Sequence, residues 1–200
     1  DYDRPIVIVN TMRINGIHII NGGKQILGLA GSTLYDLEKK LKPFGREPHS
    51  VIGSTSIGAS IIGGVCNNSG GSLVKRGPAY TELALYGKVN QNNELELINE
   101  LGIDLGSSEE EILNNIENRN FDESDIKQSN KLASDNDYPN IVRQINSSLP
   151  SRYNADKRLL NGVSGSAGKV AVFAVRLDTY DIPKKSQVFS TAEDSQPAVS

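Results

Sequence analysis

Residues 51–77 concentrate the groups of this chain that could bind a polar ligand. Six of its 19 glycines fall between Gly53 and Gly71, and Ser, Thr and Asn fill most of the positions between them. Glycine allows positive φ angles and lets another molecule approach the main chain closely. Successive backbone N–H groups can then form a concave anion site, so the stretch predicts binding of a polar ligand, with a phosphate as first candidate. A tight connection between packed elements is the alternative.

Other residues that could carry chemistry are few. His18 lies within an apolar segment, where a structural role is predicted, and His49 directly precedes the glycine-rich stretch without an acidic or nucleophilic partner. The single cysteine, Cys66, excludes an intramolecular disulfide and is expected to be a small buried side chain, not a metal ligand. Neither a Gly-x-Ser-x-Gly elbow nor a standard nucleotide-phosphate motif occurs. The sequence therefore predicts ligand binding without general acid–base groups.

Six apolar runs have the length and composition of β-strands. They lie at residues 5–9, 17–20, 25–29, 82–89, 94–98 and 169–177. The first, Pro5–Val9, is β-branched after its proline and is typical of a strand buried on both faces. The second and third flank the turn Asn21-Gly22-Gly23, which favours antiparallel pairing. The last is apolar without a break from Val170 to Val175 and is predicted to be a central strand.

Two segments predict helices. The first covers residues 33 to about 42, with Ser32 as its N-cap and apolar residues on one face. The second follows the capping box Ser108–Glu111 and ends at about Asn118. Both are expected to pack on the sheet that the apolar runs form.

The remaining segments are polar or rich in small residues. Residues 119–149 are rich in Asn, Asp and Ser and predict a surface insertion with short helical turns. Residues 162–168 form a second loop of small residues before the last strand. Residues 178–183 are predicted to be a hinge, and residues 186–189 to begin another strand.

Length and composition fit a globular domain and exclude some partners. The chain has 200 residues, 37% of them apolar, and a formal net charge of −3. Its basic residues occur at most in pairs, so it offers no basic surface for nucleic acid. The sequence shows neither an apolar run of the length of a membrane helix nor a signal peptide.

Several phrases resemble one family of enzymes. They are GREPHSVIGS at 45–54, IGASIIGG at 57–64, NNSGGSLVKRGPAYTE at 67–82, LGIDLG at 101–106, RYNAD at 152–156 and AGKVAVFAVRLDT at 167–179. They resemble the quinone-dependent D-lactate dehydrogenases of bacterial respiratory chains, which are flavoproteins with an FAD domain of the vanillyl-alcohol-oxidase (PCMH) type. The resemblance covers nearly the whole chain. One departure from the wider flavoprotein pattern is the spacing of five residues, not six, between Gly64 and Gly70.

The resemblance implies an α+β fold, a mainly antiparallel sheet flanked by helices that forms the second half of the FAD-binding domain. Residues 1–178 are then the C-terminal part of that domain, with the polar insertion at about 119–149, and residues 179–200 begin a cap domain. The chain is expected to be a fragment of a longer enzyme. The main pyrophosphate-binding loop of the family would precede Asp1, so part of the cofactor site is expected outside the chain.

The resemblance also implies contacts with FAD. Gly53 would let the chain pass close to the cofactor, Ser60 would offer a hydroxyl and Gly70 a backbone group. Val172, on the central strand, would meet the adenine side through its backbone. Two further contacts, Gly58 and Asn68, are expected beside them. No catalytic residue is assigned, because the base and the carboxylate-binding residues of the family are expected outside this chain.

The implied activity is the oxidation of D-lactate to pyruvate with FAD as hydride acceptor and quinone as electron acceptor. The isolated fragment is expected to be inactive and soluble. The implied location is the cytoplasmic face of the bacterial inner membrane, reached through regions outside this chain. Two alternatives are a related FAD enzyme that acts on another 2-hydroxy acid or an alcohol, and a non-catalytic binding module.

Overall fold

The computed structural model describes residues 3, 5, 8–50, 58–70, 73–148, 156–185 and 187. Strands within these residues are β1 (Ile17–Ile20), β2 (Gln25–Leu29), β3 (Arg46–Glu47), β4 (Ala84–Val89), β5 (Leu95–Asn99), β6 (Ala171–Asp178) and β7 (Tyr180–Asp181). The helices are α1 (Leu34–Leu41), α2 (Ile61–Cys66), α3 (Glu109–Asn118) and α4 (Tyr138–Ile141). Short 3₁₀ turns are η1 (Asn21–Gly23), η2 (Lys42–Phe44), η4 (Val74–Arg76), η5 (Glu123–Asp125) and η7 (Lys157–Leu159).

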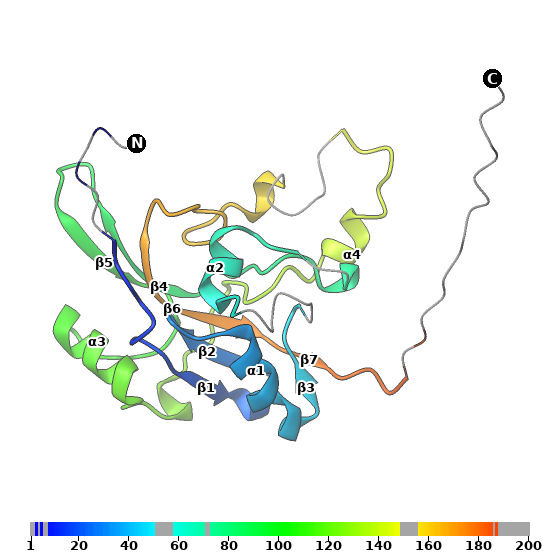
Figure 1. The fold of residues 1–200 in the computed structure, drawn as a ribbon, viewed down its shortest axis with the longest axis horizontal. Helices are drawn as coiled ribbons and strands as arrows, with labels where there is room; N and C mark the ends of the chain where they lie inside the picture. The colour runs from blue at the N-terminus through cyan, green and yellow to red at the C-terminus, as the bar shows by residue number, and fades with distance from the viewer. Residues whose placement is uncertain are drawn as a thin grey trace.

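An antiparallel sheet in the order β1-β2-β6-β4-β5 forms the centre of the described structure, and β3 pairs with β7 in a second, smaller sheet (Figure 1). All the strand pairs in these two sheets are antiparallel. The α+β class and the mainly antiparallel sheet flanked by helices are therefore confirmed. The strand predicted at 169–177 is β6, and its place between β2 and β4 confirms that it is central.

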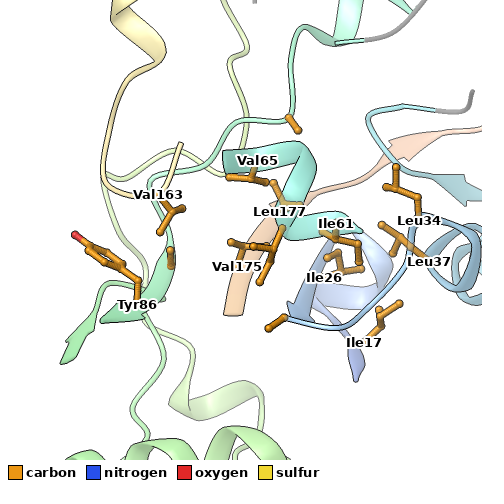
Figure 2. Close-up of a cluster of buried hydrophobic side chains, with 14 of the residues drawn as sticks. Ile17, Ile26, Leu34, Leu37, Ile61, Val65, Tyr86, Val163, Val175 and Leu177 are labelled. Atoms are coloured by element: carbon orange, nitrogen blue, oxygen red, sulfur yellow. The ribbon is translucent and has the colours of Figure 1, made fainter. Parts of the chain in front are cut away.

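Helices cover both faces of the larger sheet because its strands alternate their apolar side chains. On β2, Ile26 joins a cluster with α1 and α2, while Leu27 joins a cluster with α3 on the other face. Figure 2 shows the first cluster, in which Leu37 of α1 and Ile61 of α2 lie over the sheet. The first face is the one that carries the glycine-rich stretch.

A β-bulge changes which side chains of β6 face α2. Leu85 of β4 pairs with Ala174, but its neighbour Tyr86 pairs with Val172, so Phe173 has no opposite residue. Beyond a bulge of this kind, side chains that would have faced one side of the sheet face the other. Phe173 consequently packs with the α3 cluster together with Ala174, and Val172 packs with the α2 cluster. The bulge thus places Val172 on the same face as the glycine-rich stretch.

The polar segment 119–149 contains the predicted helical turns, η5 and α4, but its middle is not a surface insertion. Leu132 accepts a hydrogen bond from the backbone N–H of Glu82 (2.8 Å), and Ala133 accepts one from Asp178 (3.1 Å). Tyr138 is 1% exposed and packs over Gly77, where a Cβ would lie 2.9 Å from the tyrosine Cγ. The prediction was wrong there because a few apolar and backbone contacts anchor an otherwise polar sequence.

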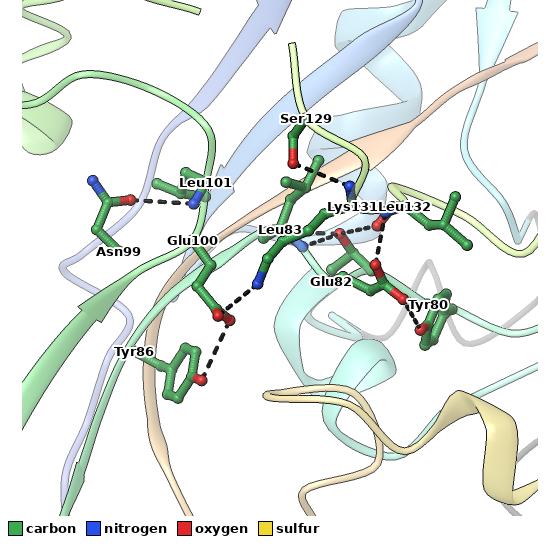
Figure 3. A network of polar contacts seen from close by, with 11 residues as sticks. Tyr80, Glu82, Leu83, Tyr86, Asn99, Glu100, Leu101, Ser129, Lys131 and Leu132 are labelled. Atoms are coloured by element: carbon green, nitrogen blue, oxygen red, sulfur yellow. Dashed lines mark hydrogen bonds and ion pairs between the residues drawn. The ribbon is translucent and has the colours of Figure 1, made fainter. Parts of the chain in front are cut away.

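Ion pairs and side-chain hydrogen bonds strengthen this anchor (Figure 3). Lys131 pairs with Glu100 at 2.5 Å, and Glu100 also accepts a hydrogen bond from the Tyr86 hydroxyl at 3.4 Å. The carboxylate of Glu82 accepts hydrogen bonds from the Tyr80 hydroxyl (2.7 Å) and from the Leu132 N–H (3.0 Å). Residues 126–138 are therefore tied to β4 and to the loop after β5.

The predicted strand at Pro5–Val9 is wrong in its described part. Ile8 and Val9 are in no strand, and they are 90% and 77% exposed. β1 is an edge strand of the described sheet, and Ile8 and Val9 do not pair with its free edge. The strand predicted at 186–189 lies almost entirely outside the described residues.

The segment predicted as a hinge is packed in its first part. Thr179 donates its backbone N–H to Lys24 (2.9 Å) and its hydroxyl to Gly23 (2.5 Å). Tyr180 and Asp181 then form β7, which pairs with β3. The division between domains at residue 178 stays a prediction, but residues 179–181 continue the packing of β6.

None of the helices described is long and apolar enough to cross a membrane.

Candidate functional site

The glycine-rich stretch contacts the residues before α1 at the point where α2 also begins. Thr33 and Ser60 form an antiparallel bridge, with hydrogen bonds from Leu34 N–H to Ala59 (2.9 Å) and from Ile61 N–H to Ser32 (3.0 Å). The Thr33 hydroxyl accepts from Asp36 N–H and caps α1, and the Ser60 hydroxyl accepts from Gly63 N–H and caps α2. Ser32, the predicted cap of α1, instead binds both backbone groups of Gly16. The bridge fixes the position of Ser60.

Two cavities open beside Ser60. The first, named here the His49 cavity, has a volume of about 420 Å³, and its polar wall includes His49, Ser50, Ser60, Ser69 and the backbone of Gly64 and Gly70. The second, the Lys40 cavity, has about 730 Å³ and is lined by Met12, Thr33, Asp36, Lys40, Gly58 and Ser60 among others. Ser60 belongs to both walls. Volumes in this range are typical of sites for small molecules and cofactors.

The predicted cofactor contacts are partly brought together. Ser60 and Gly70 share the His49 cavity, while Gly58 lies in the wall of the Lys40 cavity, on the other side of Ser60. Val172 lies on the sheet beneath α2, where the bulge places it. Gly53 lies outside the described residues. Of the predicted contacts, Ser60 and Gly70 thus share one cavity, and Val172 lies on the sheet face that carries α2.

Asn68 is fully buried behind α2 and makes an internal contact. Its side-chain amide donates a hydrogen bond to the carbonyl of Leu159 at 2.9 Å. Gly165 passes so close that a Cβ there would come within 2.8 Å of the amide nitrogen. The side-chain oxygen of Asn68 has no hydrogen-bond partner among the described residues. Asn68 therefore ties η7 to the end of α2, and Gly165 of the second small-residue loop packs against its side chain.

His49 is buried and uncharged at neutral pH. Burial lowers the pKa of its imidazole to about 4, and the positive charge of Arg76 contributes to the same shift. Among the described residues that line the His49 cavity there is no Lys, Arg, Asp or Glu. Phosphate, the first ligand candidate from the sequence, therefore finds no cationic side chain in this wall.

Ser50 is a residue that the sequence did not single out. It is 3% exposed, it lines the His49 cavity, and its hydroxyl has no hydrogen-bond partner among the described residues. A buried polar group without a partner costs about 1–3 kcal/mol, so such groups in native proteins call for an explanation. A hydrogen bond to a bound ligand would provide one.

Arg76 is a second residue that sequence reasoning missed. Its guanidinium forms an ion pair with Glu47, donates to the carbonyl of Pro48 (2.7 Å) and lies over the ring of Tyr180, 4.9 Å from its centroid. It therefore joins the end of the glycine-rich stretch to both strands of the smaller sheet, and it holds the backbone directly before His49. These contacts span residues 47 to 180, so they leave no local pattern in the sequence.

His18 and Cys66 have structural surroundings. The ring of His18 lies edge-on to Phe121 at 6.0 Å, but its Nε2 atom is buried without a partner among the described residues, so the expectation of a satisfied side chain is wrong for that atom. Cys66 is partly, not fully, buried, and burial raises the pKa of its thiol.

Comparison with known proteins finds no matching protein-family model. The chain is 58% identical over 189 residues to the quinone-dependent D-lactate dehydrogenase of Haemophilus influenzae and 54% identical over 189 residues to that of Escherichia coli. It is 47% identical over 180 residues to that of Corynebacterium glutamicum. These matches cover 94%, 94% and 90% of the chain but 34%, 33% and 31% of the relatives, so the chain spans about a third of their length. The resemblance to the quinone-dependent D-lactate dehydrogenases is thereby confirmed over nearly the whole of this chain.

Proposed function

We propose that this chain is part of the FAD-binding domain, of the PCMH type, of a quinone-dependent D-lactate dehydrogenase. The observation that supports the proposal most is the identity of 47–58% to three enzymes of that name over at least 90% of the chain. The antiparallel sheet with helices on both faces agrees with such a domain. The division into residues 1–178 and a cap beginning at residue 179 is part of the same proposal.

The residues around α2 fit a cofactor. Gly63 is required by the chain itself, because a Cβ there would lie 2.6 Å from the Ser60 hydroxyl. Gly64 is different: a Cβ there would meet only the Ala79 methyl carbon at 3.6 Å, an ordinary contact. Packing within the described chain therefore does not explain the missing side chain of Gly64, whereas a ligand in the His49 cavity would explain both it and the unpartnered hydroxyl of Ser50.

Gly53, Ser60, Gly70 and Val172 would hold FAD, with Gly58 and Asn68 beside them. The Ser60 hydroxyl already accepts the N–H of Gly63, so its proton is available for donation to the cofactor. Val172 would meet the adenine side of the cofactor through its backbone, and the bulge turns its side chain to the sheet face that carries α2. Asn68 would act by fixing η7 at Leu159, since its amide group is used inside the protein.

When bound, FAD would supply the two-electron acceptor for oxidation of D-lactate to pyruvate, with a quinone as the final acceptor. This chain's residues would hold the cofactor and exclude water from one side of it. The substrate base is assigned to regions outside the chain, as is the contact with the cytoplasmic face of a bacterial inner membrane.

The test uses the full-length protein. Purified protein is expected to carry FAD and to reduce a soluble quinone analogue with D-lactate. Flavin without activity on D-lactate would favour an enzyme for another 2-hydroxy acid or an alcohol, and we would then test these substrates. Protein that neither carries FAD nor takes it up would contradict the proposal and favour a binding module.

A further inference from the structure

The described wall of the His49 cavity comes from the start of α1, from the residues after β3 and from residues 59–70 around α2. His49 and Ser50 follow β3, while Ser60 and Gly64 belong to the start of α2. Arg76 donates a hydrogen bond to the Pro48 carbonyl (2.7 Å), which fixes the backbone directly before His49. The resemblance carried Ser60 and Gly70 as cofactor contacts, but it assigned nothing to His49 or Ser50.

The chemistry of this cavity suits an uncharged ligand group. Its wall combines serine hydroxyls and a neutral imidazole with the apolar side chains of Leu34 and Ala59. An imidazole that stays neutral offers one N–H donor and one nitrogen acceptor, and each serine hydroxyl can donate and accept. Such a wall matches a heteroaromatic ring or a polyol, which have apolar faces and hydrogen-bonding edges.

The same wall is poorly suited to a phosphate. Three of the first N–H groups of α2 are already used: Ile61 donates to Ser32 (3.0 Å), Gly63 to the Ser60 hydroxyl (3.0 Å) and Gly64 to the Ser60 carbonyl (3.2 Å). With these groups bonded and no cation among the described residues of the wall, a phosphate would exchange its hydration for neutral hydroxyl and imidazole donors alone.

We propose that His49 and Ser50 form a hydrogen-bonding subsite for the uncharged half of the cofactor, its isoalloxazine ring and ribityl chain, and that the pyrophosphate lies elsewhere. The inference rests on the proposed function and adds two residues to the site. Ser50 would turn its hydroxyl to the ligand by rotation about χ1, which gives the buried hydroxyl the partner that it lacks among the described residues. His49 would bind the ligand in its neutral form.

The experiment compares binding of riboflavin and ADP to the full-length protein after removal of its cofactor. Riboflavin binding is followed by flavin fluorescence and ADP binding by calorimetry. Ser50→Ala and His49→Leu are each expected to weaken riboflavin binding about tenfold, the effect of one lost hydrogen bond, and to leave the ADP affinity within about twofold. His49→Gln, which can still donate and accept, should keep most of the riboflavin affinity.

A control and a second measurement keep this test decisive. His18→Leu alters the other histidine, a half-buried residue on the edge strand β1, and should leave riboflavin binding unchanged. Ser50→Ala removes a hydroxyl without a described partner, so the unliganded variant should melt no lower than the unmodified protein. Unchanged riboflavin affinity in both His49→Leu and Ser50→Ala, or an equal loss of ADP affinity, would overturn the subsite. Absence of flavin binding by the unmodified protein would instead overturn the proposed function.

Discussion

Thr33 and Ser60 lie opposite each other in an antiparallel bridge, and each hydroxyl caps the helix that begins at the next residue. The two caps are chemically alike, but their surroundings differ. Ser60 lines both cavities, whereas Thr33 is absent from the wall of the His49 cavity. The pair therefore offers a matched comparison of helix capping with cofactor binding.

Thr33→Ala and Ser60→Ala should each lower the free energy of unfolding by about 1 kcal/mol, because each removes one N-cap hydrogen bond. Only Ser60→Ala is expected to lower the FAD content of the purified full-length protein. Urea unfolding of the cofactor-free protein and the ratio of flavin to protein absorbance measure the two effects. Equal flavin loss in both variants would show that Ser60 acts only as a cap.

Gly63→Ala and Gly64→Ala form a second matched pair on α2. Alanine at position 63 collides with the Ser60 hydroxyl and should destabilise the protein. Alanine at position 64 fits the chain and should stabilise the helix by up to about 1 kcal/mol, yet it should weaken FAD binding by narrowing the His49 cavity. Thermal unfolding without cofactor and FAD titration separate these outcomes. A Gly64→Ala protein that binds FAD normally would contradict a ligand beside α2.

Stability should fall as the pH falls from about 6.5 to 4, and His49 should be one cause. Its pKa is about 4 in the folded protein, against the ordinary histidine value of 6.5, so the unfolded chain binds more protons in this window. The shift corresponds to about 3 kcal/mol, present in full above pH 6.5 and lost as the pH approaches 4. The difference in unfolding free energy between the unmodified protein and His49→Gln, measured from pH 4 to 7, isolates the contribution of His49 to this pH dependence. A difference that does not vary with pH would contradict the assignment.

Limited proteolysis with trypsin should distinguish the ends of the segment 119–149 from its middle. The backbone N–H of Lys127 is bonded to Gly102, and Lys131 is paired with Glu100, so both sites should resist. Arg143 begins the exposed residues 143–148 and should be cut first. Mass spectrometry of the early fragments gives the order. Cleavage at Lys127 or Lys131 before Arg143 would restore the interpretation of the whole segment as a surface insertion.

Local patterns predicted much of this fold. The unbroken apolar run from Val170 identified the central strand, and Ser108 was correctly placed as the cap of α3. The same reasoning failed at Ile8 and Val9, because a β-branched run predicts a strand but cannot supply its partner. The sequence pattern also indicated Ser32 as the N-cap of α1, whereas the cap is Thr33. Both are hydroxyl residues and they are adjacent, so the pattern does not distinguish them.

The candidate site was less predictable because its walls meet only in the folded chain. Nothing local in the sequence distinguishes Ser50 from other serines, and its importance follows from burial against α2. The contacts of Arg76 with Glu47 and Tyr180 likewise depend on the pairing of β3 with β7. Ser60 and Gly70 were named through the resemblance, and what folding adds is their place in one cavity.

The central place of β6 has a consequence for how the chain folds. The hairpins β1–β2 and β4–β5 are each local, but β6 joins them, and Gln25 pairs with Asp178 across more than 150 residues. During synthesis both hairpins leave the ribosome long before β6, which pairs with both of them. Until then the edges of β2 and β4 that β6 will occupy have no partner in this sheet. Assembly of the sheet should therefore be a late and slow step, governed by closure of the long loop. The aggregation-prone species should be the nascent chain that ends before residue 171.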